Sequence, residues 1–360
     1  MNGRLPTRFT GALLAALVCA PGVAEAHVKW FCGPIDGSAP PQPFAQVVTP
    51  FFLELLAVFL GLVMVGAMLD AMIARFARTP IVPIDRAAML SDPLVRIGVA
   101  LYGLCLWGNL AVVMWADPSS GSVLTPDLYG TNRMVGYLQL AMAASVLIPR
   151  LSIVAAAVLV GLYAVGVAKF GPFYMIDYLF FLGLAAYIAL SDPRLGRFSV
   201  HHFRVSILIG SLSFSLMWTA VEKFLFPQWT IAVLLLHPGV TAGQPFPAVA
   251  TIAGFVEFSL AFYLLAGREI LGRVGAVLLG IVFVAAMPEF GMLDVVGHIP
   301  VLLILLVALI TGETPLQALS RGIQPGILVA GWRVGLAYIV VLTTLMALYY
   351  GLHALSVRLI

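Results

Sequence analysis

Residues 136–150, GYLQLAMAASVLIPR, and residues 254–268, GFVEFSLAFYLLAGR, share one pattern of small, polar and apolar positions. Each segment begins with Gly, carries an amide or an acid three residues later, and ends in Arg. A second matching pair follows in the same order, AKFGPFYMIDYLFFLGLAAYIAL at 168–190 and PEFGMLDVVGHIPVLLILLVALI at 288–310. The pattern predicts a duplication whose two copies have the same orientation in space.

The composition around the repeat predicts a polytopic membrane protein. Hydrophobic residues make up 62% of the 360 residues and charged residues only 10%, whereas a soluble domain carries about 25% charged residues. The net charge of +3 comes from basic residues scattered between apolar runs, which gives no reason to expect a nucleic-acid partner. The partner that this composition favours is a lipid bilayer.

Ten apolar stretches have roughly the length of a membrane span. They lie near 50–73, 94–115, 133–149, 150–168, 173–191, 204–225, 247–266, 271–288, 292–311 and 329–354. The second to fifth stretches form one four-helix unit at 94–191, and the sixth to ninth form another at 204–311. We therefore expect an all-α integral membrane protein of about ten transmembrane helices, with two parallel-repeat units and one flanking helix on each side.

Residues 1–26 have the features of a secretory signal peptide. Two arginines precede a short apolar run, and an Ala-Glu-Ala cleavage site ends at Ala26. Cleavage there would make His27 the mature N-terminus and leave 27–49 as an outer segment. The alternative is an uncleaved N-terminal anchor.

The distribution of Lys and Arg predicts the orientation. With His27 outside, the inner side receives Arg75, Arg78, Arg86, Arg96, Arg150, Arg194, Arg197, Arg204, Arg268, Arg273, Arg321 and Arg333. The outer side receives Lys29, Arg133, Lys169, Lys223 and Arg358. This asymmetry follows the positive-inside rule and predicts a bacterial-type inner (cytoplasmic) membrane, with both mature termini on the outer, periplasmic side.

The two copies differ at their polar positions, and the difference indicates which copy is functional. Gln139 corresponds to Glu257 and Lys169 to Glu289, while only the second copy adds His298. A charge at mid-bilayer costs from about 3 to more than 10 kcal/mol unless it is paired or hydrated. Because Glu257 lies about 15 Å into its span, we expect the second copy to carry the site.

Asp294 and His298 are four residues apart and share one helix face. In that arrangement the carboxylate can fix the tautomer of the imidazole, which suits a proton relay or a metal ligand. The alternative is an interfacial pair that caps the start of its helix.

Glu222 and Lys223 are adjacent, so their side chains point about 100° apart and each needs a partner from another helix. Candidates to pair with Lys223 are Glu257, Glu289 and Asp294. Alternatively, Lys223 reaches the outer head groups beside an aromatic belt that contains Trp229. The alternative for Glu257 is a protonated acid with a purely structural role.

The predicted mature N-terminus suggests a copper site. The α-amine and imidazole of His27 can chelate Cu(II), and Cys32 is a soft ligand for Cu(I). The outer-side candidates for a second imidazole are His237 and His298, apart from His353 near the C-terminus. The alternative for this N-terminal segment is an interfacial anchor.

The segments TAVEKFLFPQW (219–229), AGFVEFSLAFYLL (253–265) and EFGMLDVVGHIPVL (289–302) resemble the DoxX-like membrane family. The likeness covers about 204–311, and the first copy is a fainter version. The resemblance implies a four-helix bundle and, for some members, a membrane subunit of a quinone-linked oxidoreductase such as thiosulfate:quinone oxidoreductase. The positions that carry the family pattern are Lys223, Glu257, Asp294 and His298. The duplication, the N-terminal segment and the two flanking helices depart from the family.

The leading expectation is a redox-linked, quinone-associated membrane subunit with a polar site open to the outer face. Glu257 and the Asp294–His298 pair would move protons there, with Lys223 among the catalytic residues. The residues expected to contact the cofactor are Glu222, Glu289 and Trp229. No side chain of this site carries electrons, so the reading requires a quinone, a metal or a redox partner subunit.

Two alternatives to this function stay open. One is a protein that binds or transports a metal, such as copper held by His27 and His237, or a small solute. The other is a structural or assembly factor whose polar site only holds helices in register.

Overall fold

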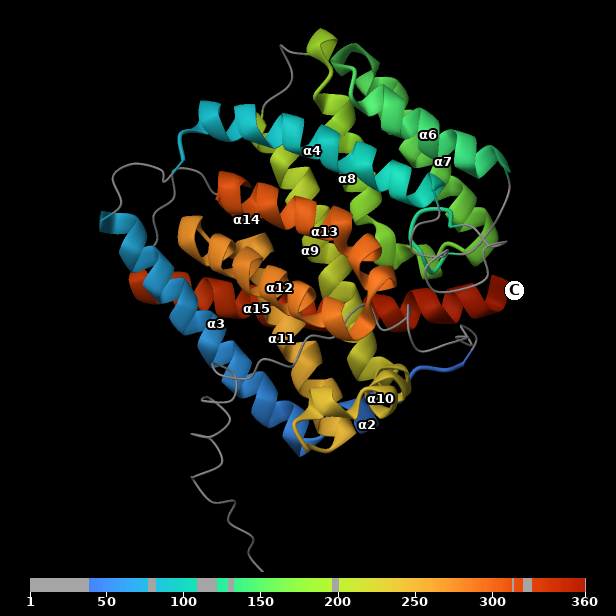
Figure 1. The fold of residues 1–360 in the computed structure, drawn as a ribbon. Coiled ribbons are helices and arrows are strands. Elements are labelled where there is room, and N and C mark those ends of the chain that lie inside the picture. Colours follow the sequence, from blue (N-terminus) through green and yellow to red (C-terminus); the bar gives the residue numbers. More distant parts are fainter. Residues whose placement is uncertain are drawn as a thin grey trace, which may run out of the picture.

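The computed structural model describes most of the chain beyond the predicted signal peptide (Figure 1). The described residues are 39–76, 82–108, 122–128, 133–195, 201–312, 314–319 and 326–359. All elements assigned in these segments are helices, so the predicted all-α class is confirmed. The predicted signal peptide, His27 and Cys32 lie outside the described residues.

The first half of the chain contains α2 (Phe44–Val47), α3 (Pro50–Phe76), α4 (Ile84–Trp107), α6 (Arg133–Val146), η2 (Pro149–Leu151), α7 (Ser152–Phe170), η3 (Tyr174–Tyr178), α8 (Phe180–Leu190) and η4 (Pro193–Leu195). The second half contains α9 (His201–Leu225), α10 (Pro227–Leu236), η5 (Pro238–Thr241), α11 (Phe246–Ala266), α12 (Glu269–Phe290), α13 (Met292–Thr311), α14 (Pro315–Leu319) and α15 (Ile327–Leu359).

Eight helices of the described segments are long and apolar enough to cross a membrane: α3, α4, α7, α9, α11, α12, α13 and α15. Three other apolar helices, α6, α8 and α10, have between 10 and 17 residues, fewer than the roughly 20 of a full span. The predicted polytopic membrane character is therefore supported. Two of the ten predicted spans correspond to the short helices α6 and α8.

The second predicted span begins earlier than expected. α4 starts at Ile84, directly after Pro83, and continues through Pro93, whereas the sequence suggested a start at residue 94. Proline inside a helix removes one backbone hydrogen bond and crowds the preceding turn, yet α4 accommodates Pro93. The described part of this helix ends at Trp107.

Consecutive helices pack against each other in the same way in both halves. Helices α4, α6, α7 and α8 contact one another in chain order, and so do α9, α11, α12 and α13. Two further contacts join the groups, α8 with α9 and α13 with α4. Each joint brings the last helix of one group against the first helix of the other, so the eight helices form a closed circuit of contacts (Figure 1).

The exposure of apolar side chains separates inner helices from outer ones. In α9, 72% of the membrane-length segment is buried, against 28% in α3 and in α15. The outer face of α12 exposes Val277, Leu278, Ile281 and Val284. A continuous apolar surface of this kind is unusual on a soluble protein, and it fits contact with lipid chains.

Helices α3 and α15 pack closely through two glycines one turn apart. A Cβ atom at Gly331 would lie 2.8 Å from Met68, and one at Gly335 would lie 2.7 Å from Met64. Small residues four positions apart let two membrane helices approach closely. The glycines therefore fix where the two flanking helices meet.

Arginines bind backbone and side-chain acceptors at one end of the bundle. Arg96 donates hydrogen bonds to the carbonyl of Val146 and to Oγ of Ser152, both at 2.8 Å. Arg204 forms an ion pair of 3.0 Å with Asp92. These bonds tie α4 to α7 and α9, where the chain turns between helices.

Arg194 extends this arginine-rich end. Its guanidinium pairs with Asp192 at 2.7 Å and donates to the carbonyl of Arg150 at 3.0 Å. The hydrogen bonds from Arg194 lower the pKa of Asp192 to about 2. Because Asp192 stays ionised at neutral pH, the pair holds the ends of α8 and η2 together.

Two helix ends near the arginine-rich end are capped by side chains of neighbouring helices. The buried Asp70 of α3 accepts the backbone N–H of Arg268 at 2.6 Å and that of Ile270 at 3.3 Å, at the start of α12. Arg273 of α12 donates to the carbonyl of Leu309 at 2.9 Å, in the last turn of α13. A carboxylate at a helix N-terminus and a cation at a C-terminus each satisfy orphan backbone groups.

Candidate functional site

The centre of the candidate site is a buried ion pair between α9 and α11. Nζ of Lys223 lies 3.0 Å from Oε2 of Glu257, with side-chain exposures of 4% and 8%. A buried ion pair is tolerated only when its geometry is good and each charge keeps a partner. Glu257 was one of three acids that the sequence offered as a partner for Lys223, and this pairing is confirmed.

Close packing between α9 and α11 positions the pair. A Cβ atom at Gly254 would lie 2.5 Å from the ring of Phe224, so a glycine is needed for this ring to lie against α11. Gly254 precedes Glu257 by three residues, and Phe224 follows Lys223. The same contact that seats the phenylalanine therefore brings the two charged side chains to one level.

Lys223 also borders a cavity of about 350 Å³ at the end of the bundle opposite the arginines. Its wall comes from the chain around α2, the start of α3, the end of α9 and the start of α11. The polar lining residues besides Lys223 are Gln42, Gln46, Thr49 and Thr251. Lys223 is thus the member of the ion pair that lines a pocket of mixed polarity.

Asp294 and His298 lie on α13 and are fully buried. Nδ1 of His298 is 3.0 Å from the backbone carbonyl of Asp294 and 3.0 Å from its Oδ1. The ring stacks on Phe283 of α12 with centroids 4.6 Å apart. His298 interacts electrostatically with Glu257, so the predicted pair and the Lys223–Glu257 pair belong to one polar interior.

Glu222 has its own partner on the other side of α9. The hydroxyl of Tyr349 on α15 donates to Oε1 of Glu222 at 2.7 Å. Tyr349 stacks on Trp218 with centroids 4.7 Å apart and interacts electrostatically with Asp177 of η3. The adjacent charges Glu222 and Lys223 are thus satisfied by different helices, as their directions on a helix require.

Two predicted contact residues lie away from the ion pair. Glu289 pairs with His237, whose Nδ1 is 2.7 Å from Oε1, and its side chain is 54% exposed. Trp229 stacks on Phe226 with centroids 4.2 Å apart. Neither Glu289 nor Trp229 borders the cavity beside Lys223. The predicted site residues therefore do not form one cluster, because the His237–Glu289 pair lies apart from the buried Lys223–Glu257 pair.

The described residues do not bring metal ligands together. In the part of the chain with described positions, no group of three or more His, Cys, Asp or Glu side chains could hold a metal ion. His237 has the Glu289 carboxylate beside it. His27, the other predicted copper ligand, lies outside the described residues.

Gln139, which the sequence comparison aligns with Glu257, has neutral partners. Nε2 of Gln139 donates to the carbonyls of Ser122 and Val123, the latter at 3.1 Å. The segment 122–128 is almost wholly buried, and its Asp127 accepts a hydrogen bond of 2.8 Å from Tyr178. Backbone carbonyls of a buried loop therefore occupy the place beside Gln139.

Sequence reasoning missed Tyr349 and Asp70. Tyr349 lies in the C-terminal flanking helix, and no spacing links it to Glu222. Asp70 lies near the end of a predicted span, where an acid reads as a solvated rim residue. The available signal was that a buried acid without a hydrogen-bond donor is costly. That cost predicts that Glu222 and Asp70 have partners, but it does not identify the partner residues.

No protein-family model, curated protein or solved structure matches the chain.

Proposed function

We propose that this protein is a quinone-associated membrane subunit that exchanges protons at the Lys223–Glu257 pair. The observation that carries the proposal is a buried ion pair whose lysine lines a cavity of about 350 Å³ of mixed polarity. A quinone presents carbonyl oxygens that accept hydrogen bonds, and the ammonium group of Lys223 and the side-chain amides of Gln42 and Gln46 can donate them.

The proposed chemistry depends on a competition between Glu257 and a ligand oxygen for the ammonium group of Lys223. If its ammonium group turns toward a ligand oxygen, Glu257 loses its partner and is left as a buried carboxylate, which is costly. Glu257 then takes up a proton, because a buried acid without a cationic partner is less costly in its neutral form. Ligand binding is thereby linked to proton uptake, and affinity rises as pH falls.

A bound quinone supplies a two-electron couple whose reduction consumes two protons. The electrons come from an electron carrier on a partner subunit, because the polar side chains of this site transfer protons only. The Asp294–His298 pair lies one helix away and serves as a proton reservoir behind Glu257.

The repeat supports placing the site in the second half. We infer two parallel four-helix units, because their helices pack in the same order and join reciprocally, α8 to α9 and α13 to α4. Lys223 and Glu257 form a charged pair in the second unit. Gln139 of the first unit instead has the backbone carbonyls of a buried loop as neutral partners.

The orientation is part of the proposal. The arginine-rich end faces the cytoplasm by the positive-inside rule, which puts the Lys223 cavity and both mature termini on the outer side of a bacterial-type inner membrane. The resemblance of three sequence segments to the DoxX-like family supports the proposal, because some members of that family are four-helix subunits of quinone-linked oxidoreductases.

Titration of the purified protein in lipid nanodiscs with decylubiquinone tests the proposal, with quenching of tryptophan fluorescence as the readout. Lys223→Met should weaken binding by about tenfold or more, because a hydrogen bond from a charged donor contributes about 1.5–3 kcal/mol. Wild-type affinity should rise as pH falls, because binding is linked to proton uptake. Glu257→Gln should bind with no such pH dependence, because an amide takes up no proton.

The matched control is Glu289→Gln, the same chemical change in an exposed acid that pairs with His237. It should bind like the wild type at every pH. Absence of saturable binding to the wild type, or equal effects of Lys223→Met and Glu289→Gln, would refute a quinone site here. Loss of thermal stability in the Lys223 and Glu257 variants with unchanged binding would make the pair purely structural.

A further inference from the structure

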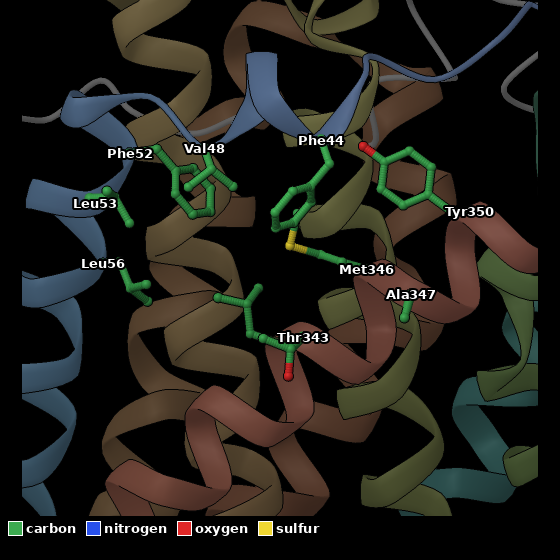
Figure 2. Close-up of a pocket in the computed structure, with 10 residues that line it drawn as sticks. Phe44, Val48, Phe52, Leu53, Leu56, Thr343, Met346, Ala347 and Tyr350 are labelled. Atoms are coloured by element: carbon green, nitrogen blue, oxygen red, sulfur yellow. The ribbon is translucent and has the colours of Figure 1, made fainter.

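A large apolar groove lies on the opposite side of α2 from the polar cavity. Its volume is about 600 Å³, and it lies between α3 and α15 (Figure 2). The lining residues of α2 and α3 include Phe44, Phe52 and Leu56, and those of α15 include Thr343 and Met346. Figure 2 shows side chains of both helices pointing into the space, with Phe44 reaching down from α2 toward Met346.

The groove exists because α3 and α15 meet closely at one end only. At the arginine-rich end, Gly331 and Gly335 bring the helix axes together against Met68 and Met64. Toward α2 the facing positions carry larger side chains, among them Leu342. The two helices are thus held together at one end and kept apart at the other.

The groove offers no polar group to an occupant. The hydroxyl of Thr343 donates back to the carbonyl of Ile339 at 2.8 Å, so the threonine presents its methyl group. The hydroxyl of Tyr350 donates to the carbonyl of Gln42 at 2.6 Å. A space without polar partners does not hold ordered water, so hydrocarbon is the occupant that its chemistry accepts.

The groove and the polar cavity adjoin at Phe52, which lines both. Its ring packs on Phe224 and Phe255, with centroids 5.2 Å and 4.8 Å away. Phe224 follows Lys223, and Phe255 precedes Glu257 by two residues. The polar cavity and the apolar groove therefore meet at one aromatic cluster beside the ion pair.

We infer that the groove binds the hydrocarbon chain of the molecule whose polar head occupies the cavity beside Lys223. The ligand is then a long-chain amphiphile that enters sideways from the bilayer. This inference rests on the proposed function for the head group, and it adds the class of ligand: a head with acceptor oxygens joined to a single apolar chain.

Photocrosslinking in nanodiscs tests the inference. The probe is a decylubiquinone analogue with a diazirine at the end of its chain, and mass spectrometry maps the labelled residues. Labelling should concentrate on groove residues such as Leu56, Leu342 and Met346, and tailless ubiquinone in excess should reduce it. Ala347→Trp should reduce groove labelling at least tenfold, because the indole fills the space that the chain needs.

Ala354→Trp is the matched control, since Ala354 is an exposed alanine of the same helix outside the groove. It should label like the wild type. Thr343→Leu provides a milder filling variant if Ala347→Trp does not fold. Labelling spread evenly over lipid-facing helices, or groove labelling that tailless ubiquinone leaves unchanged, would overturn the chain site. In either case, intact fluorescence binding of decylubiquinone would leave the head-group site standing.

Discussion

The Lys223–Glu257 pair places two opposite charges where neither can reach bulk water on its own. Its contribution to stability is small as long as both partners are present, because attraction offsets the loss of hydration. Removing one partner is different, because the remaining charge stays buried. The pair therefore makes folding sensitive to single substitutions and tolerant of a double one.

We expect Lys223→Met to lower the thermal unfolding temperature strongly, because breaking a buried pair on one side costs about 3–5 kcal/mol. Adding Glu257→Gln in the same chain should restore most of the loss, because no buried charge remains. Differential scanning fluorimetry of the two single variants and the double variant in one detergent measures the coupling. Additive losses would mean that the two side chains do not depend on each other in the folded protein.

Several residues of the site could be predicted, and the reasons are physical. The cost of a mid-bilayer carboxylate predicted that Glu257 needs a partner, and the direction of Lys223 on its helix predicted that the partner lies elsewhere. The bond between Glu222 and Tyr349 could not be predicted, because it depends on which face of α15 lies against α9. Glu289 was grouped with the site for its position at a helix end, yet its neighbour is His237.

Helix α12 is joined to both of its neighbours, α3 and α13, by polar contacts at the arginine-rich end. Asp70 of α3 caps its first turn, and its own Arg273 caps the last turn of α13. Sequence patterns recognise a cap when it belongs to the same helix. A cap supplied by another helix has no local signature, so the sequence placed α12 correctly but not its anchoring.

Asp70→Ala should destabilise the protein by about 1–2 kcal/mol, because loss of an N-terminal cap leaves backbone N–H groups unsatisfied. Glu54→Ala is the control, since Glu54 is an exposed acid on the same helix. Thermal unfolding followed by loss of helical circular dichroism compares the two. Equal midpoints for both variants would mean that the Asp70 contacts contribute nothing to stability.

At the scale of the whole molecule, the two ends of the bundle differ in charge and in openness. One end is bound together by arginines, and the other carries α2, the polar cavity and the apolar groove. Helix lengths limited what the sequence could reveal here. The short α6 and α8 were predicted as spans because their apolar runs continue into neighbouring turns. The turns of α4 before Pro93 were not part of the predicted span.

Single-cysteine labelling should establish the orientation, in chains whose native cysteines are replaced by serine. Gln46→Cys lies in α2, and Pro193→Cys lies at the arginine-rich end; both positions are exposed. An impermeant maleimide added to intact spheroplasts should label Gln46→Cys alone, with labelling of both after lysis. The reverse labelling pattern would mean that the orientation in the membrane is inverted and that the Lys223 cavity faces the cytoplasm.

The cap that Asp70 provides also has a consequence for biosynthesis. Its carboxylate leaves the ribosome 198 residues before the amide of Arg268 that it accepts. While the residues between Asp70 and Arg268 are being synthesised, the carboxylate of Asp70 lacks the backbone donors of Arg268 and Ile270. It must therefore stay hydrated at the level of the lipid head groups. Completion of α12 then fixes the position of α3, so the first membrane-length helix of the described residues is secured only after most of the others have been made.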